Sequence, residues 1–360
     1  FCGIWLSTMN LSTVLVDLSK LKYPNTGLGQ FCLHFGQELK RQPHPGSDTV
    51  FLLPPAIPPQ FSGDRHVAAS SGRRYLPWLN SGYDLWHATH QDSPFFPNKN
   101  TPYLLTIHDL NFLWEKSGMK LFRRLKRLEK RIGKAAAVVF SSEFTRQTVL
   151  SLTPLAGDIP SQVIYLGVAP IEEIVPEPPK ALPSGPFVFS IGVIKPSKNF
   201  AALVEWMAHM PDLNLVISGN ADQPCADMLR NRIVDLKMED RIWLTGEVRE
   251  NEKAWFYREC EAFVLASKLE GFGIPAIEAM RMGKPVFVSN LTSLPEVAGE
   301  EAFYWDNFDP EDMKRVFEEG MNFFAGDSDK KVRLRRHALR FTWAETVKNY
   351  MVLYQNLLKP

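Results

Sequence analysis

Short apolar runs alternate with longer amphipathic stretches along nearly the whole chain. In the first half, the runs that predict strands are Thr13–Leu18, Thr49–Leu53, Leu85–Ala88, Tyr103–Ile107, Ala137–Phe140 and Val163–Tyr165. In the second half, they are Phe187–Ile191, Leu213–Ser218, Arg241–Leu244, Ala262–Ala266, Pro285–Ser289 and Ala302–Tyr304. Strands that are apolar throughout and separated by helices indicate parallel sheets covered on both faces. We therefore predict an α/β protein built from doubly wound domains.

The alternation breaks once, in a proline-rich stretch at residues 171–186. Proline lacks an amide donor and fixes φ, so this stretch is typical of a stiff linker. We therefore predict an N-terminal domain over residues 1–170 and a C-terminal domain over 187–340. The amphipathic end of the chain, residues 341–360, is predicted to be a helix that packs back across the junction.

Composition and charge narrow the class of protein. The 360 residues are 45% hydrophobic and 22% charged, as in an ordinary globular protein. A formal net charge of +1 argues against nucleic acid as a partner. The four cysteines form no CxxC pair, so a redox or metal motif is not expected and a cytoplasmic location is. Residues 1–10 lack a basic start and a small-residue cleavage site, so no signal peptide is expected there.

The most specific local pattern follows the predicted strand Ala262–Ala266 and leads into a predicted helix at about Pro275. Gly271 and Gly273 allow backbone amides to approach a ligand, and a helix N-terminus adds positive dipole. A loop of this kind suits a diphosphate.

Two carboxylates, Glu270 and Glu278, flank these glycines. A carboxylate accepts two hydrogen bonds from a vicinal diol, so the pair could hold a sugar at one end and a ribose at the other. The alternative is that Glu278 is an acid in the first helical turn, favouring the helix dipole by roughly 0.3–1 kcal/mol. Glu270 would then be a solvated loop charge.

The motif resembles that of the family-4 retaining glycosyltransferases, which have the GT-B architecture of two Rossmann-like domains facing across a cleft. Their signature is two glutamates separated by seven residues, as in Glu270 and Glu278. The resemblance implies that Glu270 contacts hydroxyls of the donor sugar and Glu278 the ribose. It also implies that the amides of Gly271, Phe272, Gly273 and Ile274 meet the diphosphate.

Ser190–Asn199 is similar to a second family motif, in which a lysine at the position of Lys198 meets the donor diphosphate. An arginine usually accompanies that lysine, whereas Val193 and Ser197 stand at the corresponding places here. We expect Lys195 to supply part of the missing charge. Gly246, Glu247 and Val248 resemble the loop whose backbone contacts the nucleobase, and Ser293–Glu296 a segment that lines the donor side.

In the first domain, Gly27 and Gly29 match a family loop that faces the donor. Cys32 stands where a dinucleotide fingerprint has its third glycine, so a nicotinamide cofactor is disfavoured. His108 ends a predicted strand and matches a family histidine close to the transferred sugar. The resemblance thus assigns catalytic roles to His108, Lys198 and Glu270. Since basic side chains and amides hold the diphosphate in this family, no metal and no cofactor are expected.

Residues 116–134 carry nine basic side chains and one acid, Glu129. Leucine, phenylalanine and isoleucine recur among them at helical spacing, which indicates an amphipathic helix with a basic face. In one interpretation the apolar stripe packs on its own domain and the charges are solvated. In the other, the basic face meets anionic lipid at the inner face of a membrane.

The sequence therefore predicts a retaining glycosyltransferase that moves a hexose-type sugar from a nucleotide-diphosphate sugar. The acceptor would be a glycan or glycolipid of surface-polysaccharide or lipopolysaccharide assembly. Three alternatives stay open: an inactive partner subunit that binds donor, a sugar-nucleotide epimerase of the same architecture, and a glycoside phosphorylase.

Overall fold

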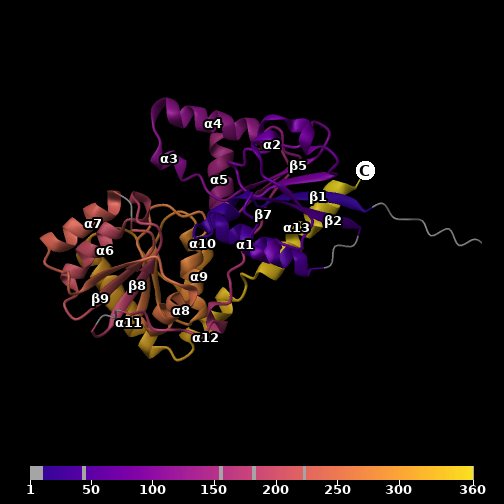
Figure 1. Ribbon diagram of the computed structural model, residues 1–360. Coiled ribbons are helices and arrows are strands. Elements are labelled where there is room, and N and C mark those ends of the chain that lie inside the picture. Colours follow the sequence, from indigo (N-terminus) through magenta and orange to yellow (C-terminus); the bar gives the residue numbers. More distant parts are fainter. Residues whose placement is uncertain (1–10, 43–45, 154–156, 181–183, 222–223, 360) are drawn as a thin grey trace, which may run out of the picture. The chain divides into compact units, whose positions relative to one another are not determined.

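The computed structural model describes residues 11–42, 46–153, 157–180, 184–221 and 224–359 (Figure 1). Residues 1–10, where no signal peptide was expected, lie outside that range. The chain divides into two compact units. The first extends to Gly167 and takes in Trp343–Pro360, and the second is Val168–Thr342. In the described part of the chain, no helix has the length and apolar character needed to cross a membrane.

The first unit is organised around a parallel sheet with the strand order β3-β2-β1-β4-β5-β6-β7. Its strands are β1 (Ser12–Asp17), β2 (Ser47–Leu53), β3 (His66–Ala68), β4 (Leu85–Ala88), β5 (Tyr103–Ile107), β6 (Ala137–Phe140) and β7 (Ser161–Val163). The four residues of β4 and the five of β5 are all buried, as expected for central strands covered on both faces.

The helices of the first unit begin at residues that suit helix termini. Thr26 caps α1, and Ser142 caps α5, each accepting a hydrogen bond from an amide of the first turn. The helices are α1 (Gly27–Arg41), α2 (Ser71–Tyr75), α3 (Phe112–Glu115), α4 (Gly118–Ile132), α5 (Glu143–Leu152) and α13 (Trp343–Leu358), with 3-10 turns η1 (Ser19–Lys22), η2 (Pro59–Phe61) and η3 (Pro77–Asn80).

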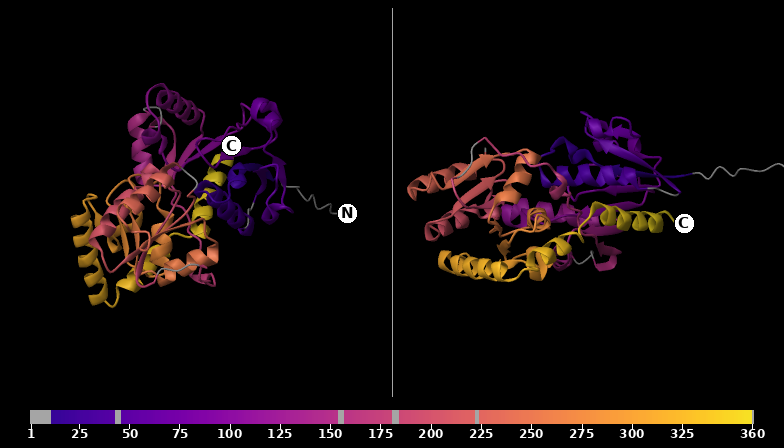
Figure 2. Two further views of the ribbon diagram at one scale, coloured as in Figure 1. Left: turned by 60° about the vertical axis from the view of Figure 1, so that its left-hand side comes forward. Right: turned by 90° about the horizontal axis from the view of Figure 1, so that it is seen from below.

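The C-terminal helix α13 belongs to the first unit, where it packs on α1 and β4. Figure 2 shows this yellow helix lying along that unit. Tyr350 packs edge-on against Phe35 of α1, and Trp343 packs against Phe31. These buried aromatic contacts hold the last helix of the chain on its first helix.

The second unit has a parallel sheet in the order β10-β9-β8-β11-β12-β13. Its strands are β8 (Phe187–Ile191), β9 (Asn214–Ser218), β10 (Ile242–Gly246), β11 (Ala262–Leu265), β12 (Val286–Ser289) and β13 (Phe303–Trp305). The helices are α6 (Phe200–Trp206), α7 (Pro224–Asp235), α8 (Glu250–Glu259), α9 (Ile274–Arg281), α10 (Leu294–Ala298), α11 (Pro310–Gly326) and α12 (Lys330–Ala338), with 3-10 turns η5 (Ile171–Glu173), η6 (Pro196–Lys198), η7 (Met207–His209) and η8 (Gly299–Glu301).

The prediction of two doubly wound parallel sheets is confirmed. The strand β3 was not predicted, because its three residues at the sheet edge are only partly buried and carry no apolar run. Strand β7 begins two residues before the predicted run, for the same reason. The boundaries between the units fall after Gly167 and after Thr342, close to the ends of the predicted domains.

Candidate functional site

The strand order of the second sheet reverses between β8 and β11. In open α/β sheets, ligands bind outside the carboxyl ends of the strands at such a reversal. Strand β8 ends at Ile191 and β11 at Leu265, and the loops that follow them contain Lys198 and Glu270. Two of the three residues predicted to be catalytic therefore lie at the topological switch point of this unit.

The structure joins Lys198 and Glu270 directly, with 2.5 Å between Lys198 Nζ and Glu270 Oε1. Both side chains are largely buried, at 14% and 11% exposed. Ser267 Oγ donates a hydrogen bond to the same carboxylate oxygen at 2.8 Å. The backbones of the two loops are also connected, because Lys268 N donates to Ser197 O at 2.8 Å. These contacts hold the ammonium and the carboxylate in a fixed position.

The peptide of Glu270 is anchored to a third loop, which follows β12. Its amide donates to Thr292 Oγ1 at 3.1 Å, and its carbonyl accepts from Ser293 Oγ at 3.0 Å. Thr292 adopts a left-handed conformation with φ of 58°, which turns this loop back toward Glu270. The segment Ser293–Glu296 thus lies beside the glutamate.

Helix α9 begins directly after the glycine loop. Gly273 is its N-cap with φ of 100°, a conformation that favours glycine, and no side chain caps the helix. A Cβ atom at this position would lie 2.6 Å from Leu294 Cδ2. The backbone at Gly273 therefore lies close to Leu294, the first residue of α10, and the dipole of α9 favours an anion at its N-terminus.

Helix α9 begins at Ile274, one residue before the predicted start at about Pro275, and Glu278 is its fifth residue, in the second turn. Its predicted place in the first turn was wrong, so a favourable interaction with its own helix dipole no longer explains it. Glu278 is buried and accepts hydrogen bonds from Tyr257 Oη at 2.8 Å and from Lys253 Nζ at 3.0 Å. Lys253 also pairs with Glu250 at 2.8 Å.

Burial and the charge of neighbouring carboxylates determine the pKa values of Lys253 and Tyr257, the two donors to Glu278. Burial alone would lower the pKa of Lys253, but the carboxylates of Glu278 and Glu250 raise it above its usual value. Burial and the same glutamate raise the pKa of Tyr257. Both neighbours of Glu278 are therefore protonated at neutral pH and act as donors to its carboxylate.

The remaining donor-side residues lie at the same sheet edge. Gly192 follows β8, Gly219 follows β9 and Gly246 ends β10. Gly192 N donates to Ser218 O at 2.9 Å, and Gly219 N donates to Gly246 O at 2.8 Å. Glu247 is exposed and Val248 half-buried just beyond β10, whereas Lys195 is half-buried as the N-cap of η6. This end of the sheet brings backbone peptide groups together with the side chains of Lys195 and Glu247.

The three candidates of the first unit lie near its own switch point, between β1 and β4. His108 follows β5 and is buried, and its Nε2 donates to Thr89 O at 2.8 Å. Burial lowers the pKa of His108 to about 4, although the bond to Thr89 acts in the opposite direction. The imidazole is consequently neutral at pH 7.

Gly27 and Gly29 open helix α1. Gly27 has open space around it, whereas a Cβ on Gly29 would lie 2.0 Å from Tyr23 O. The amide of Gly29 donates to Thr26 Oγ1, the cap of the helix. Gly29 therefore has a structural reason to be glycine, and Gly27 is the one of the two that leaves room for a ligand.

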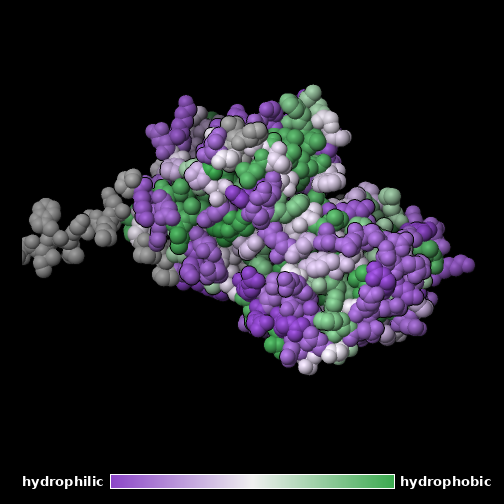
Figure 3. All heavy atoms as spheres, turned by 180° about the vertical axis from the view of Figure 1, so that it is seen from behind, coloured by the Kyte–Doolittle hydropathy of each residue, from purple (hydrophilic) through white to green (hydrophobic). Residues whose placement is uncertain are grey.

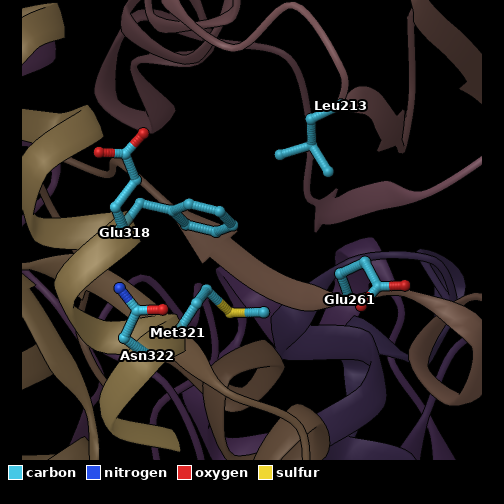
Figure 4. Close-up of a pocket in the computed structure, with 6 residues that line it drawn as sticks. Leu213, Glu261, Glu318, Met321 and Asn322 are labelled. Carbon is cyan, nitrogen blue, oxygen red and sulfur yellow. The ribbon is translucent and has the colours of Figure 1, made fainter. Parts of the chain in front are cut away.

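A pocket of about 350 Å³ lies elsewhere, lined by Leu213, Glu261, Phe317, Glu318, Met321 and Asn322 (Figure 4). Leu213 precedes β9 and Glu261 precedes β11, so the pocket is at the amino ends of the strands. The pocket is therefore at the opposite end of the strands from Lys198 and Glu270. In the described part of the chain, no group of three His, Cys, Asp or Glu residues is placed to hold a metal ion.

Sequence reasoning missed Ser267, Thr292, Lys253 and Tyr257. They reach the site through the fold, and only their proximity to a strand end or to a motif could have indicated them. The direct pairing of Lys198 with Glu270 was not predicted either, because the two residues are separated by 72 positions.

Comparison with known proteins places this site in context. Residues 173–338 match the family model for glycosyl transferases group 1. The computed structure is similar to Anabaena HepE in complex with UDP-glucose (TM-score 0.76, 15% identity, 96% of this chain and 99% of that one). It is also similar to sucrose-phosphate synthase from Thermosynechococcus elongatus (TM-score 0.75, 17% identity, 96% and 99%). The two Rossmann-like units define a protein of the GT-B fold.

The curated relatives of this chain include several mannosyltransferases. O-antigen chain mannosyltransferase B of Escherichia coli is 24% identical over 94% of this chain and 100% of its own length. O-antigen chain mannosyltransferase RfbU of Salmonella typhimurium is 29% identical over 84% and 88%. The E. coli mannosyltransferase WbdA is 29% identical over 44% of this chain, and the match spans a fifth of the length of WbdA. The match to the glycosyl transferases group 1 model lies within the second unit of the chain.

Proposed function

We propose that the chain is a retaining glycosyltransferase that moves a hexose, with mannose first among the candidates, from a nucleoside-diphosphate sugar to a glycan acceptor. The observation that carries the proposal is the Lys198–Glu270 pair beside the uncapped N-terminus of α9. The names of the full-length relatives, both O-antigen mannosyltransferases, favour mannose and a role in surface-polysaccharide assembly.

The proposed chemistry assigns one task to each part of the switch point. The anomeric C–O bond to the diphosphate breaks, and the acceptor oxygen forms its bond on the same face of the sugar. The acceptor proton passes to the departing phosphate oxygen. Amides at Gly271–Ile274 and the Lys198 ammonium stabilise the charge that develops on the diphosphate. Lys195 would contribute further positive charge.

The other assignments follow the same scheme. Glu270 binds hydroxyls of the donor sugar while its second interaction, with Lys198, fixes its orientation. Glu278 binds the ribose, and the backbone at Gly246–Val248 contacts the base. Because its imidazole is neutral, His108 would act toward the sugar as a hydrogen-bonding group and not as a cation.

A membrane-bound acceptor accounts for the charge of α4. The helix buries Leu128 and Ile132 against its own unit, as the first interpretation of this segment requires. Two of its arginines have structural partners: Arg124 pairs with Asp92, and Arg131 is buried with Nη1 2.8 Å from Gln91 O. The exposed basic side chains are Lys120, Arg123, Lys126, Arg127 and Lys130. We propose that these meet anionic lipid at the cytoplasmic face of a membrane.

The decisive experiment is a donor screen on the full-length protein. UDP-, GDP- and ADP-linked mannose and glucose are tested for thermal stabilisation, and then for transfer to lipid-linked and soluble saccharides, with the anomer determined by NMR. We expect one donor to bind and to yield a product of retained configuration, and Glu270→Gln to reduce turnover more than affinity for the nucleoside diphosphate. Donor binding without transfer would instead favour the inactive subunit, and a changed sugar on the nucleotide would favour the epimerase.

A further inference from the structure

A short segment of the first unit exposes an unusual concentration of large apolar side chains. Tyr75, Leu76, Trp78 and Leu79 are all exposed, Tyr75 at 68% and Trp78 at 62%. They occur within five consecutive positions, where α2 ends and η3 begins. We name the segment Tyr75–Leu79 the apolar wedge. Scattered single apolar side chains are normal on a surface, whereas a contiguous group of this kind indicates an interaction site.

Buried polar contacts give the apolar wedge a fixed shape. Asn80, which is fully buried, donates through Nδ2 to Arg73 O at 2.9 Å and to Phe96 O at 2.7 Å. Arg73 Nη1 in turn donates to Asn80 Oδ1 at 3.2 Å and to Leu79 O. These hydrogen bonds hold both ends of the wedge on the rest of the unit, so the exposed apolar side chains are carried by a fixed backbone.

The charged residues next to the wedge in the sequence are arginines. Between Asp64 and Asp84 the chain contains three arginines and no acidic residue. Arg74 is exposed, and its guanidinium lies 5.2 Å from the ring centroid of Tyr75. An aromatic and aliphatic surface bordered by arginine complements an anionic lipid interface, where tryptophan and tyrosine are enriched and arginine meets phosphate.

The wedge adjoins the end of the basic helix α4. Asn80 anchors the wedge to the backbone of Phe96, and Arg131 and Lys134 lie over the ring of the same phenylalanine at 5.0 and 5.3 Å. Figure 1 shows α2 and α4 in the same unit, and Figure 3 shows green hydrophobic side chains among hydrophilic ones on the surface of that unit. Phe96 thus links the wedge to the C-terminal end of α4.

We propose that the apolar wedge inserts Tyr75, Leu76, Trp78 and Leu79 into the interfacial layer of an anionic bilayer. The inference rests on the proposed function only in that a membrane-bound acceptor gives such insertion a purpose. Electrostatic attraction through α4 would weaken with salt, whereas burial of the wedge in lipid would not. The two contributions can therefore be separated.

The experiment measures binding of the full-length protein to phosphatidylcholine vesicles with and without 30% phosphatidylglycerol, at low and at high salt. Tyr75→Ser/Trp78→Ser should bind anionic vesicles about tenfold or more weakly at both salt concentrations. Leu152→Ser/Val352→Ser removes two exposed apolar side chains elsewhere in the same unit and should bind as the wild type does. Charge reversal at Lys120, Arg123, Arg127 and Lys130 should instead abolish the salt-sensitive part.

A second readout reports insertion itself. Lipids brominated near the headgroup should quench wild-type tryptophan fluorescence, and Trp78→Phe, which keeps an apolar ring, should bind while losing part of that quenching. Vesicle binding by the double serine variant equal to that of the wild type, or unchanged quenching in Trp78→Phe, would refute insertion. Donor turnover with a soluble acceptor should be the same in the wedge variant as in the wild type. A wedge that does not insert into lipid is thereby distinguished from a protein that lacks the proposed transferase activity.

Discussion

At the scale of single residues, Glu278 is the most informative side chain. Its partners Tyr257 and Lys253 hold the carboxylate inside the unit, so a change to alanine would also leave a buried ammonium with fewer partners. Glu278→Gln keeps an oxygen for the Tyr257 hydroxyl, and we expect it to weaken nucleoside-diphosphate binding by about 1–3 kcal/mol. Calorimetry on a variant with an unchanged melting temperature measures this, and unchanged affinity would contradict the ribose role.

Gly273 supplies a second prediction at this scale. Gly273→Ala combines a positive φ with a Cβ atom 2.6 Å from Leu294, so it should lower stability by about 1–3 kcal/mol and weaken donor binding as the loop shifts. Gly326→Ala is the matched control, because nothing lies within 4 Å of its Cβ position. Chemical denaturation and donor titration compare the two variants. Equal effects would show that the head of α9 is not constrained as described.

The sequence could predict which residue types gather at this site, but not how they pair. The spacing of Glu270 and Glu278 and the position of Lys198 could be recognised in the sequence. The ion pair between Lys198 and Glu270 depends on the adjacency of β8 and β11, which only the strand order fixes. The partners of Glu278, Tyr257 and Lys253, come from α8, and the sequence does not show which helices lie side by side.

At the scale of elements, α13 is fastened to the first sheet by a buried polar network. His87 on β4 lies 2.6 Å from Tyr354 Oη and 2.9 Å from Thr106 Oγ1, and Thr106 Oγ1 lies 2.9 Å from Tyr350 Oη. Tyr354→Phe should therefore cost about 1–3 kcal/mol of stability, because it leaves a buried imidazole nitrogen without its partner. Val352→Ala on the exposed side of the same helix should cost much less. Urea denaturation of both variants tests the network.

The same network predicts a response to acid. Burial lowers the pKa of His87 to about 3, so the folded chain keeps this imidazole neutral while the unfolded chain takes up a proton below about pH 6.5. Stability should fall as pH decreases from 6.5 toward 3, by about 1.4 kcal/mol per pH unit for such a histidine. His87→Gln should reduce this slope between pH 6 and 5 by about 1.4 kcal/mol per pH unit, and the contribution of His108, whose pKa burial also lowers, should remain. An unchanged slope in that variant would show that His87 does not titrate as described.

Elements were predicted well where strands are central and almost entirely buried, as in β4, β5 and β8. They were predicted less well at the edges of the first sheet, in β3 and β7, where partial burial weakens the apolar pattern. The attachment of α13 to α1 and β4 could be only a general expectation, since it depends on contacts separated by hundreds of positions. The apolar wedge had no periodic pattern to mark it and emerged only from its exposure.

At the scale of the whole molecule, the proposed transfer should not depend on a divalent metal. Lys198 and the backbone amides at the head of α9 are assigned the charge of the diphosphate, so activity should persist in EDTA. Steady-state assays with and without chelator, followed by addition of magnesium or manganese, measure this. Loss of activity with EDTA and recovery with metal would require a different account of how the diphosphate is held.

The division of the chain has a further consequence, for the order of events during synthesis. The second unit is an insertion within the first, because the chain leaves the first unit at Gly167 and resumes it at Trp343. At a ribosomal elongation rate of about 5–20 residues per second, roughly 10–35 seconds separate the two parts. During that interval α13 has not yet been synthesised. Phe35 therefore lacks its ring contact with Tyr350, and His87 lacks its hydrogen bond with Tyr354 Oη. The first unit is therefore completed last. Until α13 is synthesised, the nascent form of that unit exposes to chaperones the surface of α1 and β4 that α13 will cover.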